Sequence, residues 1–212
     1  MFNHVFVPYV VVASAVFGIV MLVLIFAVIR YRAGRPHEAS QKSEHNRAEA
    51  IYGAALVVIA ATLAVYVGTA NASERAPLGR PTLHVTIVAF QWCWDFDYVH
   101  DGVKVRGDCS QRYPTLVVPT HEIIEFSLIS RDVIHEWWLP EARWKEEAFP
   151  DHYNNFQLRF SITGRWQGRC DEFCGLYHDE MDFFVKAEPK RAFDTWLSSQ
   201  RHKSGVSLAS SP

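Results

Sequence analysis

The chain has 212 residues, which is enough for one ordinary domain with extra segments and too few for two large domains. Its net charge of −2 gives no basic field of the kind found in nucleic-acid-binding proteins, so we expect no nucleic acid among its partners. Hydrophobic residues make up 49% of the chain, yet the mean hydropathy is −0.04, which indicates that apolar segments are balanced by a polar region.

Two segments near the N-terminus have no charged side chains. Residues 5–29 and residues 50–72 each reach the roughly 20 apolar residues that are needed to cross hydrocarbon. We therefore predict membrane helices over residues 1–31 and 49–73. A cleaved signal peptide is the alternative for the first segment, but no Lys or Arg precedes it, and Arg30, Arg32 and Arg35 follow it.

The basic residues predict how these helices are oriented. The linker over residues 32–48 contains Lys42 and Arg47, whereas residues 1–4 contain no Lys or Arg. The positive-inside rule then places this linker in the cytoplasm. Both termini, and the region that follows the second helix, are expected on the outer side of a bacterial cytoplasmic membrane.

The polar region, residues 74–190, has the pattern of a β domain. Apolar residues alternate with other residues over 82–89 and 156–162, and residues 123–129 and 183–185 are further candidates for strands. Several short strands without intervening helices predict an all-β sandwich or barrel. Residues 191–212 are expected to form a short helix with an apolar stripe, followed by a disordered tail.

Soft metal-ligand side chains are concentrated near the end of this region. Cys170, Cys174, His178 and Met181 lie within a dozen positions, and a weak Met ligand beside Cys and His is typical of copper electron-transfer sites. Each residue also has a structural interpretation, such as a disulfide, a core side chain or a loop histidine. These interpretations would require four soft ligands to be clustered by chance, so a shared metal site explains the group better.

A second cysteine exceeds what a single blue-copper ion requires. Two cysteines on one loop can bridge two copper ions, but each ion still needs an imidazole, and the loop contains only His178. His135 is the candidate for the other imidazole, because it lies in a strand-like segment that ends at Pro140.

The paired motifs DVIHxxxxP (from Asp132) and GxCxExCGxxHxxM (from Gly168) resemble those of cytochrome c oxidase subunit II. The resemblance implies two transmembrane helices followed by a cupredoxin-like domain over residues 74–190. It implies a binuclear copper centre, CuA, in which Cys170 and Cys174 bridge the ions. The other ligands implied by the family are His135, His178, Met181 and the carbonyl of Glu172. The side chain of Glu172 would also bind magnesium or manganese at the contact with subunit I.

The resemblance gives roles to two further residues. Trp92 would be the point where electrons enter, and Glu49 would mark the cytoplasmic mouth of a proton path. The alternative for Trp92 is a core residue, which is the interpretation we favour for Trp94, Phe96 and Tyr98. The alternative for Glu49 is a carboxylate that is stabilised at a helix start.

The implied function is that of the electron-entry subunit of the oxidase, which passes electrons from cytochrome c to the haem-copper subunit I, where oxygen is reduced. Expected partners are subunit I, other oxidase subunits, a c-type cytochrome and membrane lipid. Two alternatives are a CuA subunit of a nitric oxide reductase and a membrane-tethered, non-enzymatic copper-binding cupredoxin. Exposed carboxylates, among them Asp95 and Glu147, are expected to steer a basic partner.

Cys93 and Cys109 lie outside the copper motif. They flank an expected hairpin with its turn near Asp101 and Gly102. We hypothesise that they form a disulfide in an oxidising compartment, which requires α-carbons within about 7 Å. Two free thiols are the alternative.

Overall fold

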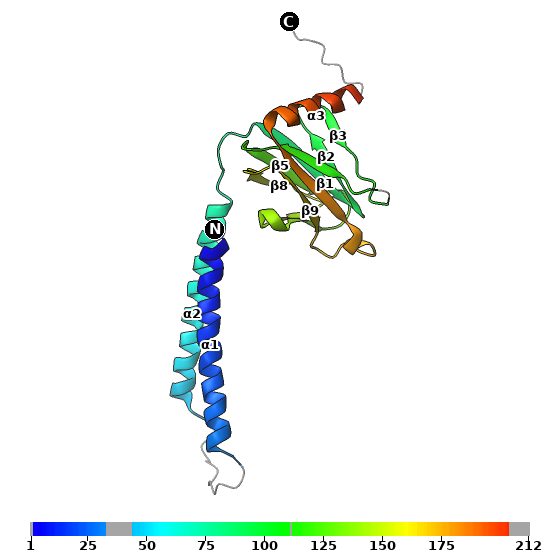
Figure 1. Ribbon diagram of the computed structural model, residues 1–212. Coiled ribbons are helices and arrows are strands. Elements are labelled where there is room, and N and C mark those ends of the chain that lie inside the picture. The colour runs from blue at the N-terminus through cyan, green and yellow to red at the C-terminus, as the bar shows by residue number, and fades with distance from the viewer. Residues whose placement is uncertain (1, 33–43, 111, 204–212) are drawn as a thin grey trace. The chain divides into compact units, whose positions relative to one another are not determined.

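A computed structural model describes residues 2–32, 44–110 and 112–203 of the chain (Figure 1). The chain divides into two units, residues 1–76 and residues 77–212. Part of the predicted cytoplasmic linker and the final part of the predicted tail lie outside the described residues.

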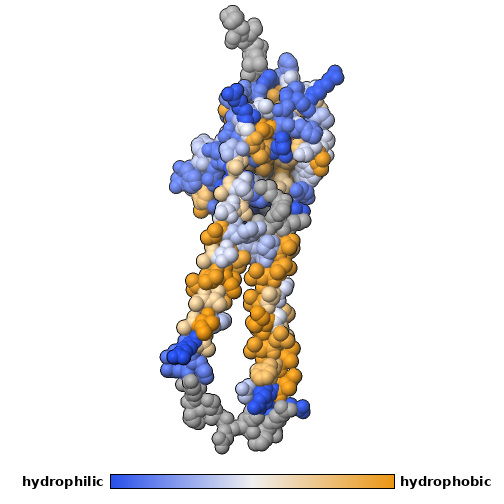
Figure 2. All heavy atoms as spheres, turned by 90° about the vertical axis from the view of Figure 1, so that its left-hand side faces the viewer, coloured by the Kyte–Doolittle hydropathy of each residue, from blue (hydrophilic) through white to orange (hydrophobic). Residues whose placement is uncertain are grey.

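The first unit consists of two apolar helices, α1 (Phe2–Arg30) and α2 (Asn46–Glu74), of 29 residues each. At 1.5 Å per residue such a helix is about 44 Å long, which exceeds the ~30 Å of a bilayer's hydrocarbon core. None of the most apolar stretch of either helix is buried, and Figure 2 shows hydrophobic side chains along their sides. The helices contact each other where the Tyr9 hydroxyl donates to the Leu63 carbonyl at 3.4 Å. The expected pair of membrane helices is confirmed.

The second unit is a sandwich of two five-stranded sheets, as predicted. The first sheet has the order β3-β2-β1-β5-β8, and its strands are β1 (Leu83–Phe90), β2 (Cys93–Tyr98), β3 (Val103–Val105), β5 (Ile124–Ser130) and β8 (Asn154–Leu158). The second has the order β4-β10-β9-β6-β7, and its strands are β4 (Thr115–Pro119), β6 (His135–Leu139), β7 (Trp144–Ala148), β9 (Gly164–Cys170) and β10 (Asp182–Glu188). The pairs β1–β5 and β4–β10 are parallel, and the other pairs are antiparallel.

Alternating side chains form the core between the sheets. In β1 the inward positions Leu83, Val85, Ile87 and Ala89 are buried, and β5 repeats the pattern with every second residue buried. Large aromatic rings fill the space between the layers, and Trp137 stacks on Phe183 with a centroid distance of 5.2 Å. This packing makes the sheets a stiff support for the loops that connect them.

One end of the second sheet brings distant parts of the chain together. Cys170 is the last residue of β9, and Asp182 is the first residue of β10, so the connecting loop begins and ends on paired strands. The adjacent strand β6 begins with His135 and pairs with β9, with Trp137 opposite Cys170. The loop of residues 171–181, here called the copper loop, is therefore anchored at both ends next to His135.

A C-terminal helix covers part of the sandwich. Helix α3 (Lys190–Lys203) buries Phe193 and Leu197, and its Trp196 ring packs on Tyr98. Two short 3-10 helices, η1 (Pro140–Ala142) and η2 (His178–Glu180), complete the described elements.

Candidate metal centre

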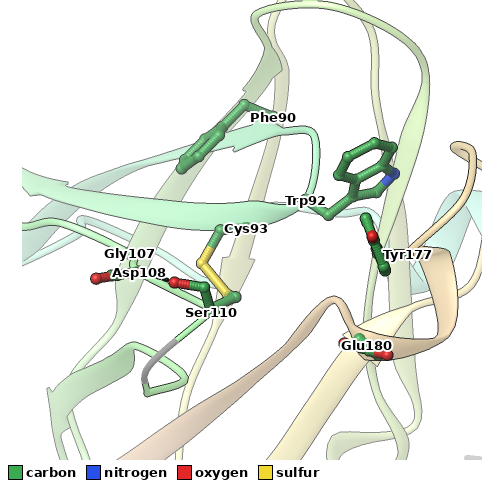
Figure 3. Close-up of a pocket in the computed structure, with 9 residues that line it drawn as sticks. Phe90, Trp92, Cys93, Gly107, Asp108, Ser110, Tyr177 and Glu180 are labelled. Atoms are coloured by element: carbon green, nitrogen blue, oxygen red, sulfur yellow. Dashed lines mark hydrogen bonds between the residues drawn. A yellow bond between two sulfur atoms is a disulfide. The ribbon is translucent and has the colours of Figure 1, made fainter.

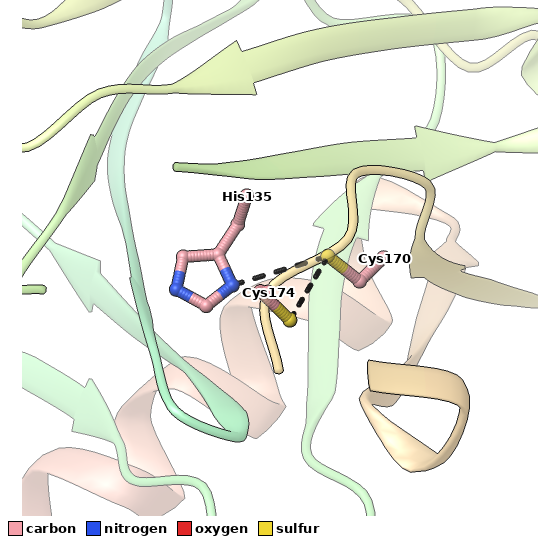
Figure 4. Close-up of side chains that lie close together, drawn as sticks. All are labelled: His135, Cys170 and Cys174. Atoms are coloured by element: carbon pink, nitrogen blue, oxygen red, sulfur yellow. Dashed lines mark hydrogen bonds between the residues drawn. The ribbon is translucent and has the colours of Figure 1, made fainter. Parts of the chain in front are cut away.

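The candidate ligands lie at the end of the sandwich where β6, β9 and the copper loop meet. His135 and Met181 are fully buried, and the cysteines Cys170 and Cys174 are 5% and 3% exposed. His178, the first residue of η2, is half-buried. Among the described residues, the only buried cluster of His, Cys and carboxylate ligands is formed by His135, Cys170 and Cys174 (Figure 4).

The ligand atoms form a chain of close contacts. The sulfur atoms of Cys170 and Cys174 are 3.9 Å apart and do not form a disulfide. His135 Nδ1 lies 3.9 Å from the Cys170 sulfur, and His178 Nδ1 lies 3.5 Å from the Cys174 sulfur. Each cysteine sulfur also has one candidate weak ligand beside it. The Glu172 carbonyl is 3.3 Å from the Cys170 sulfur, and the Met181 sulfur is 3.8 Å from the Cys174 sulfur.

This arrangement fits a pair of soft metal ions. A metal–thiolate bond is about 2.3 Å long, so one ion can bond to two sulfur atoms that are 3.9 Å apart. One imidazole and one weak ligand lie next to each sulfur, which supplies two similar ligand sets rather than one. The combination of thiolate, imidazole and thioether favours copper.

Three side chains from the β1–β2 turn and the start of β2 hold the copper loop. Gln91 Nε2 and Trp92 Nε1 both donate to the carbonyl of Cys174, at 2.8 and 3.2 Å. Trp94 Nε1 donates to the carbonyl of Met181 at 3.2 Å. The loop backbone is therefore fixed at Cys174 and at Met181 by side chains from outside the loop.

Asp132 orients the imidazole of His135. Its Oδ1 atom lies 2.8 Å from His135 Nε2, so Nε2 carries the proton and Nδ1 is left to face Cys170. The Oδ2 atom of Asp132 accepts the backbone N–H of Gln91 at 2.7 Å. One carboxylate thus connects a ligand histidine to the turn that carries Trp92. This role was missed in the sequence, although the spacing Asp-x-x-His is a local signal for it.

A lysine joins the two strands that carry the first ligands. Lys145 Nζ lies 3.2 Å from a carboxylate oxygen of Glu136 and 3.2 Å from one of Asp171, the neighbours of His135 and Cys170. The two hydrogen bonds raise the pKa of Lys145, whereas burial raises the pKa of Glu136. Since Lys145 is largely exposed, we expect the contact to fix geometry more than to add stability.

Burial favours the neutral forms of His135, Cys170 and Cys174. It raises the pKa of Cys170 and raises that of Cys174 to about 12. It also lowers the pKa of His135, and the hydrogen bond to Asp132 offsets only part of that effect. For Asp132, burial acts to raise the pKa, but hydrogen bonds from Gln91, His135 and Val133 outweigh it and the pKa is lowered. Metal binding must therefore displace the thiol protons.

The remaining predicted site residues have different surroundings. Trp92 is half-buried and packs edge-on against Tyr177 with a centroid distance of 4.9 Å. The side chain of Glu172 is exposed, and only its carbonyl joins the ligand cluster. Glu49 lies in the first turn of α2, where its carboxylate accepts the backbone N–H of His45 at 3.2 Å. That contact is the one expected of a helix-start carboxylate.

The expectation that Asp95 is a surface charge is wrong. Asp95 is 3% exposed, and its carboxylate binds Arg106 at 2.8 Å, Arg131 at 2.6 Å and the Gly107 N–H at 2.9 Å. Its charge is compensated and enclosed, so it cannot meet a partner. Glu147, by contrast, is exposed.

The predicted disulfide is confirmed. Cys93 and Cys109 are bonded, with a Cα–Cα distance of 5.5 Å. The chain therefore combines one disulfide with two free, buried thiols in the same domain.

We predict that Asp132→Ala lowers copper affinity by about 10–100-fold, because His135 loses the hydrogen bond that fixes its tautomer. Competition with a chelator of known affinity measures the change. Asp151→Ala is the matched control, because Asp151 makes a similar 2.7 Å contact with the exposed His152, outside the ligand cluster. Equal affinities of the two variants would show that Asp132 does not orient the ligand.

We also predict that the metal-free protein loses stability as the pH rises above about 9. The unfolded thiols then lose protons that the folded state retains, because burial raises the pKa of both cysteines above the ordinary value of 9.0. Thermal unfolding between about pH 7 and pH 10 should show a steeper loss for the wild type than for Cys170→Ser/Cys174→Ser. If stability falls equally with pH in the wild type and in the variant, the two thiols do not have the raised pKa values that their burial predicts.

Comparison with known proteins identifies the family of the β domain. The family model described as cytochrome c oxidase subunit II, periplasmic domain, matches residues 83–188, which is half of the chain. The periplasmic domain of subunit II of cytochrome oxidase from Bradyrhizobium japonicum has the same fold. That likeness has a TM-score of 0.54 and 23% identity, and it covers 60% of this chain and 99% of the other.

Curated relatives have the same family name. Cytochrome c oxidase subunit 2 of Bacillus sp. (strain PS3) is 35% identical over 127 residues, covering 57% of this chain and 34% of that protein. The probable cytochrome c oxidase subunit 2 of Nocardia farcinica is 40% identical over 111 residues, covering 49% of this chain and 29% of that protein. The probable subunit 2 of Rickettsia conorii is 26% identical over 207 residues, covering 89% of this chain and 64% of that protein. The chain thus spans less than two thirds of the length of these relatives, and it belongs to the cytochrome c oxidase subunit II family.

Proposed function

We propose that this chain is the electron-entry subunit of a cytochrome c oxidase. It accepts electrons from cytochrome c at a binuclear CuA centre and passes them to the haem-copper subunit I, which reduces oxygen. The observation that carries the proposal is the pair of buried thiols 3.9 Å apart, each with an imidazole of its own beside it.

When bound, a copper pair supplies the ability to take up and release one electron at a time. The residues of the chain make this exchange fast by limiting movement. Met181 and His135 are enclosed by the core, and the carbonyls of Cys174 and Met181 are held by indole N–H groups. Because the ligands are fixed by packing and hydrogen bonds, little rearrangement is expected when the charge changes.

Trp92 is the proposed entry point. Its half-buried ring reaches the surface beside Tyr177, and its N–H donates to the carbonyl of Cys174. A single side chain thus connects a possible contact surface to a ligand residue.

A surface hollow adjoins this ring and supports docking at the same place. It has a volume of about 450 Å³ and is lined by Trp92, Tyr177, Phe90, the disulfide and the carboxylates of Asp108 and Glu180, among other residues (Figure 3). Glu180, a steering charge already expected from the sequence, is exposed, and the exposed Asp108 takes the place of Asp95 among the charges proposed to steer a basic cytochrome. Salt should weaken that attraction.

The rest of the proposal concerns the assembly. The two helices would lie among other oxidase subunits and lipid, with the copper domain on the outer side of the cytoplasmic membrane. The exposed Glu172 carboxylate would share magnesium or manganese with subunit I. Glu49 would mark the entrance of a proton path, a role that its place in the first turn of α2 allows.

Metal analysis and electron paramagnetic resonance of the copper-loaded chain test the centre. We predict two copper ions per chain that share one unpaired electron, because two thiols and two imidazoles are available. Cys174→Ser should leave at most a mononuclear centre. A wild-type spectrum with the hyperfine pattern of one copper nucleus, or a preference for a single zinc ion, would contradict the proposal.

Rapid mixing with a reduced c-type cytochrome tests the entry point. Trp92→Phe should slow electron transfer within the bound complex by about tenfold or more, because the donor to the Cys174 carbonyl is lost. Binding, which depends on charge, should change little. The matched control is Trp144→Phe, the same substitution at a half-buried indole of β7. Wild-type transfer in Trp92→Phe would place the entry elsewhere.

A further inference from the structure

The disulfide lies next to the side chains that hold the copper loop. Cys93 stands between Trp92 and Trp94, whose indole N–H groups donate to the carbonyls of Cys174 and Met181, each at 3.2 Å. Trp92 and both cysteines of the disulfide line the same hollow (Figure 3). Cys93 is therefore the residue that joins the two donors, Trp92 in the β1–β2 turn and Trp94 in β2.

The other half of the disulfide reaches the far end of the copper loop. The Cys109 sulfur lies 3.7 Å from the carbonyl oxygen of Asp182, the residue that follows Met181. The disulfide thus spans from the start of β2 to the point where the loop returns to the sheet.

The chain around Cys109 is pressed against β2 by further contacts. Arg106 and the Gly107 N–H both bind the buried carboxylate of Asp95, at 2.8 and 2.9 Å. A Cβ atom on Gly107 would lie 2.2 Å from the Trp94 carbonyl oxygen and 2.6 Å from the Cys93 sulfur. Only glycine allows so close an approach. Arg106 also lies 3.4 Å from a carboxylate oxygen of Asp97. Residues 106–109, here called the staple segment, are therefore held on β2 by the disulfide and three polar contacts.

We propose that the Cys93–Cys109 disulfide and the staple segment position the copper loop. They act through Trp92, Trp94 and Asp182. None of the contacts described above joins the disulfide or the staple segment to the side chain of a candidate metal ligand. Without the disulfide, the staple segment keeps its contacts with Asp95 and Asp97, and the loop loses the neighbouring Cys109 sulfur beside Met181. The role rests on the proposed function, since it concerns retention of copper.

The test uses the full-length chain in detergent and compares Cys93→Ala/Cys109→Ala with Leu197→Ala. Leu197 is a buried residue of α3, so its truncation lowers the stability of the domain without substituting any residue of the staple segment. The disulfide variant should release copper to a chelator roughly tenfold faster than the wild type. Leu197→Ala should release it at the wild-type rate, even though its melting temperature falls. Equal release rates for the disulfide variant and the wild type would overturn the proposal, as would equal acceleration in both variants.

Hydrogen exchange of the metal-free protein gives a second readout. Amides of residues 174–182 should exchange faster in the disulfide variant than in Leu197→Ala. If the double variant does not fold, wild-type protein reduced with a phosphine after folding replaces it. Unchanged exchange in this segment would overturn the positioning role. If the wild type binds no copper, the proposed function fails, while the exchange result still decides the role of the staple segment.

Discussion

Two buried sulfur atoms, those of Cys170 and Cys174, lie 3.9 Å apart without a bond between them, and the rest of the site depends on this separation. A shorter distance would favour a disulfide and remove both ligands, and a much longer one would prevent an ion from reaching both sulfurs. The separation is set by the sheet, because the copper loop leaves β9 and returns to β10 on paired strands. The N–H of Cys170 also donates to the carbonyl of Met181 at 3.1 Å, which closes the base of the loop.

Around this pair, three of the candidate ligands have supports of their own. Asp132 holds His135, the indole of Trp94 holds the backbone at Met181, and Gln91 and Trp92 hold the backbone at Cys174. Most of these supports come from the turn between β1 and β2 and its continuation. The same short segment therefore fixes the metal ligands and presents Trp92 at the surface, which couples the geometry of the centre to the proposed entry of electrons.

The sequence predicted the parts of the structure that depend on local patterns. The two apolar runs are long enough to specify membrane helices by composition alone, and the alternation in β1 follows from one face being buried. The alternation over residues 156–162 predicted a strand that the structure ends at Leu158, in β8. The ligand motif is local as well, with the exception of His135. Its distance of 35 positions from Cys170 is bridged by the pairing of β6 with β9, which periodicity does not specify. The strand-like segment that ends at Pro140 made His135 a candidate, and the resemblance to a family then gave it the role of a ligand.

Other features depend on tertiary contacts and could not be predicted in this way. Asp95 alternates with Trp94 and Phe96 and thus faces outward, but Arg106 and Arg131 fold over it and enclose the charge. The disulfide was a hypothesis because the hairpin alone does not specify how residues 106–109 lie on β2. The double contact of Asp132, with His135 and with Gln91, requires the β1–β2 turn to lie beside β6.

The central claim is that the buried donor set holds two metal ions that share both thiolates. X-ray absorption at the copper edge of the copper-loaded, full-length chain tests it most directly, because it reports the neighbours of each copper ion. The account predicts a nearby copper neighbour in addition to sulfur and nitrogen ligands. Sulfur and nitrogen neighbours without a second copper ion would contradict it.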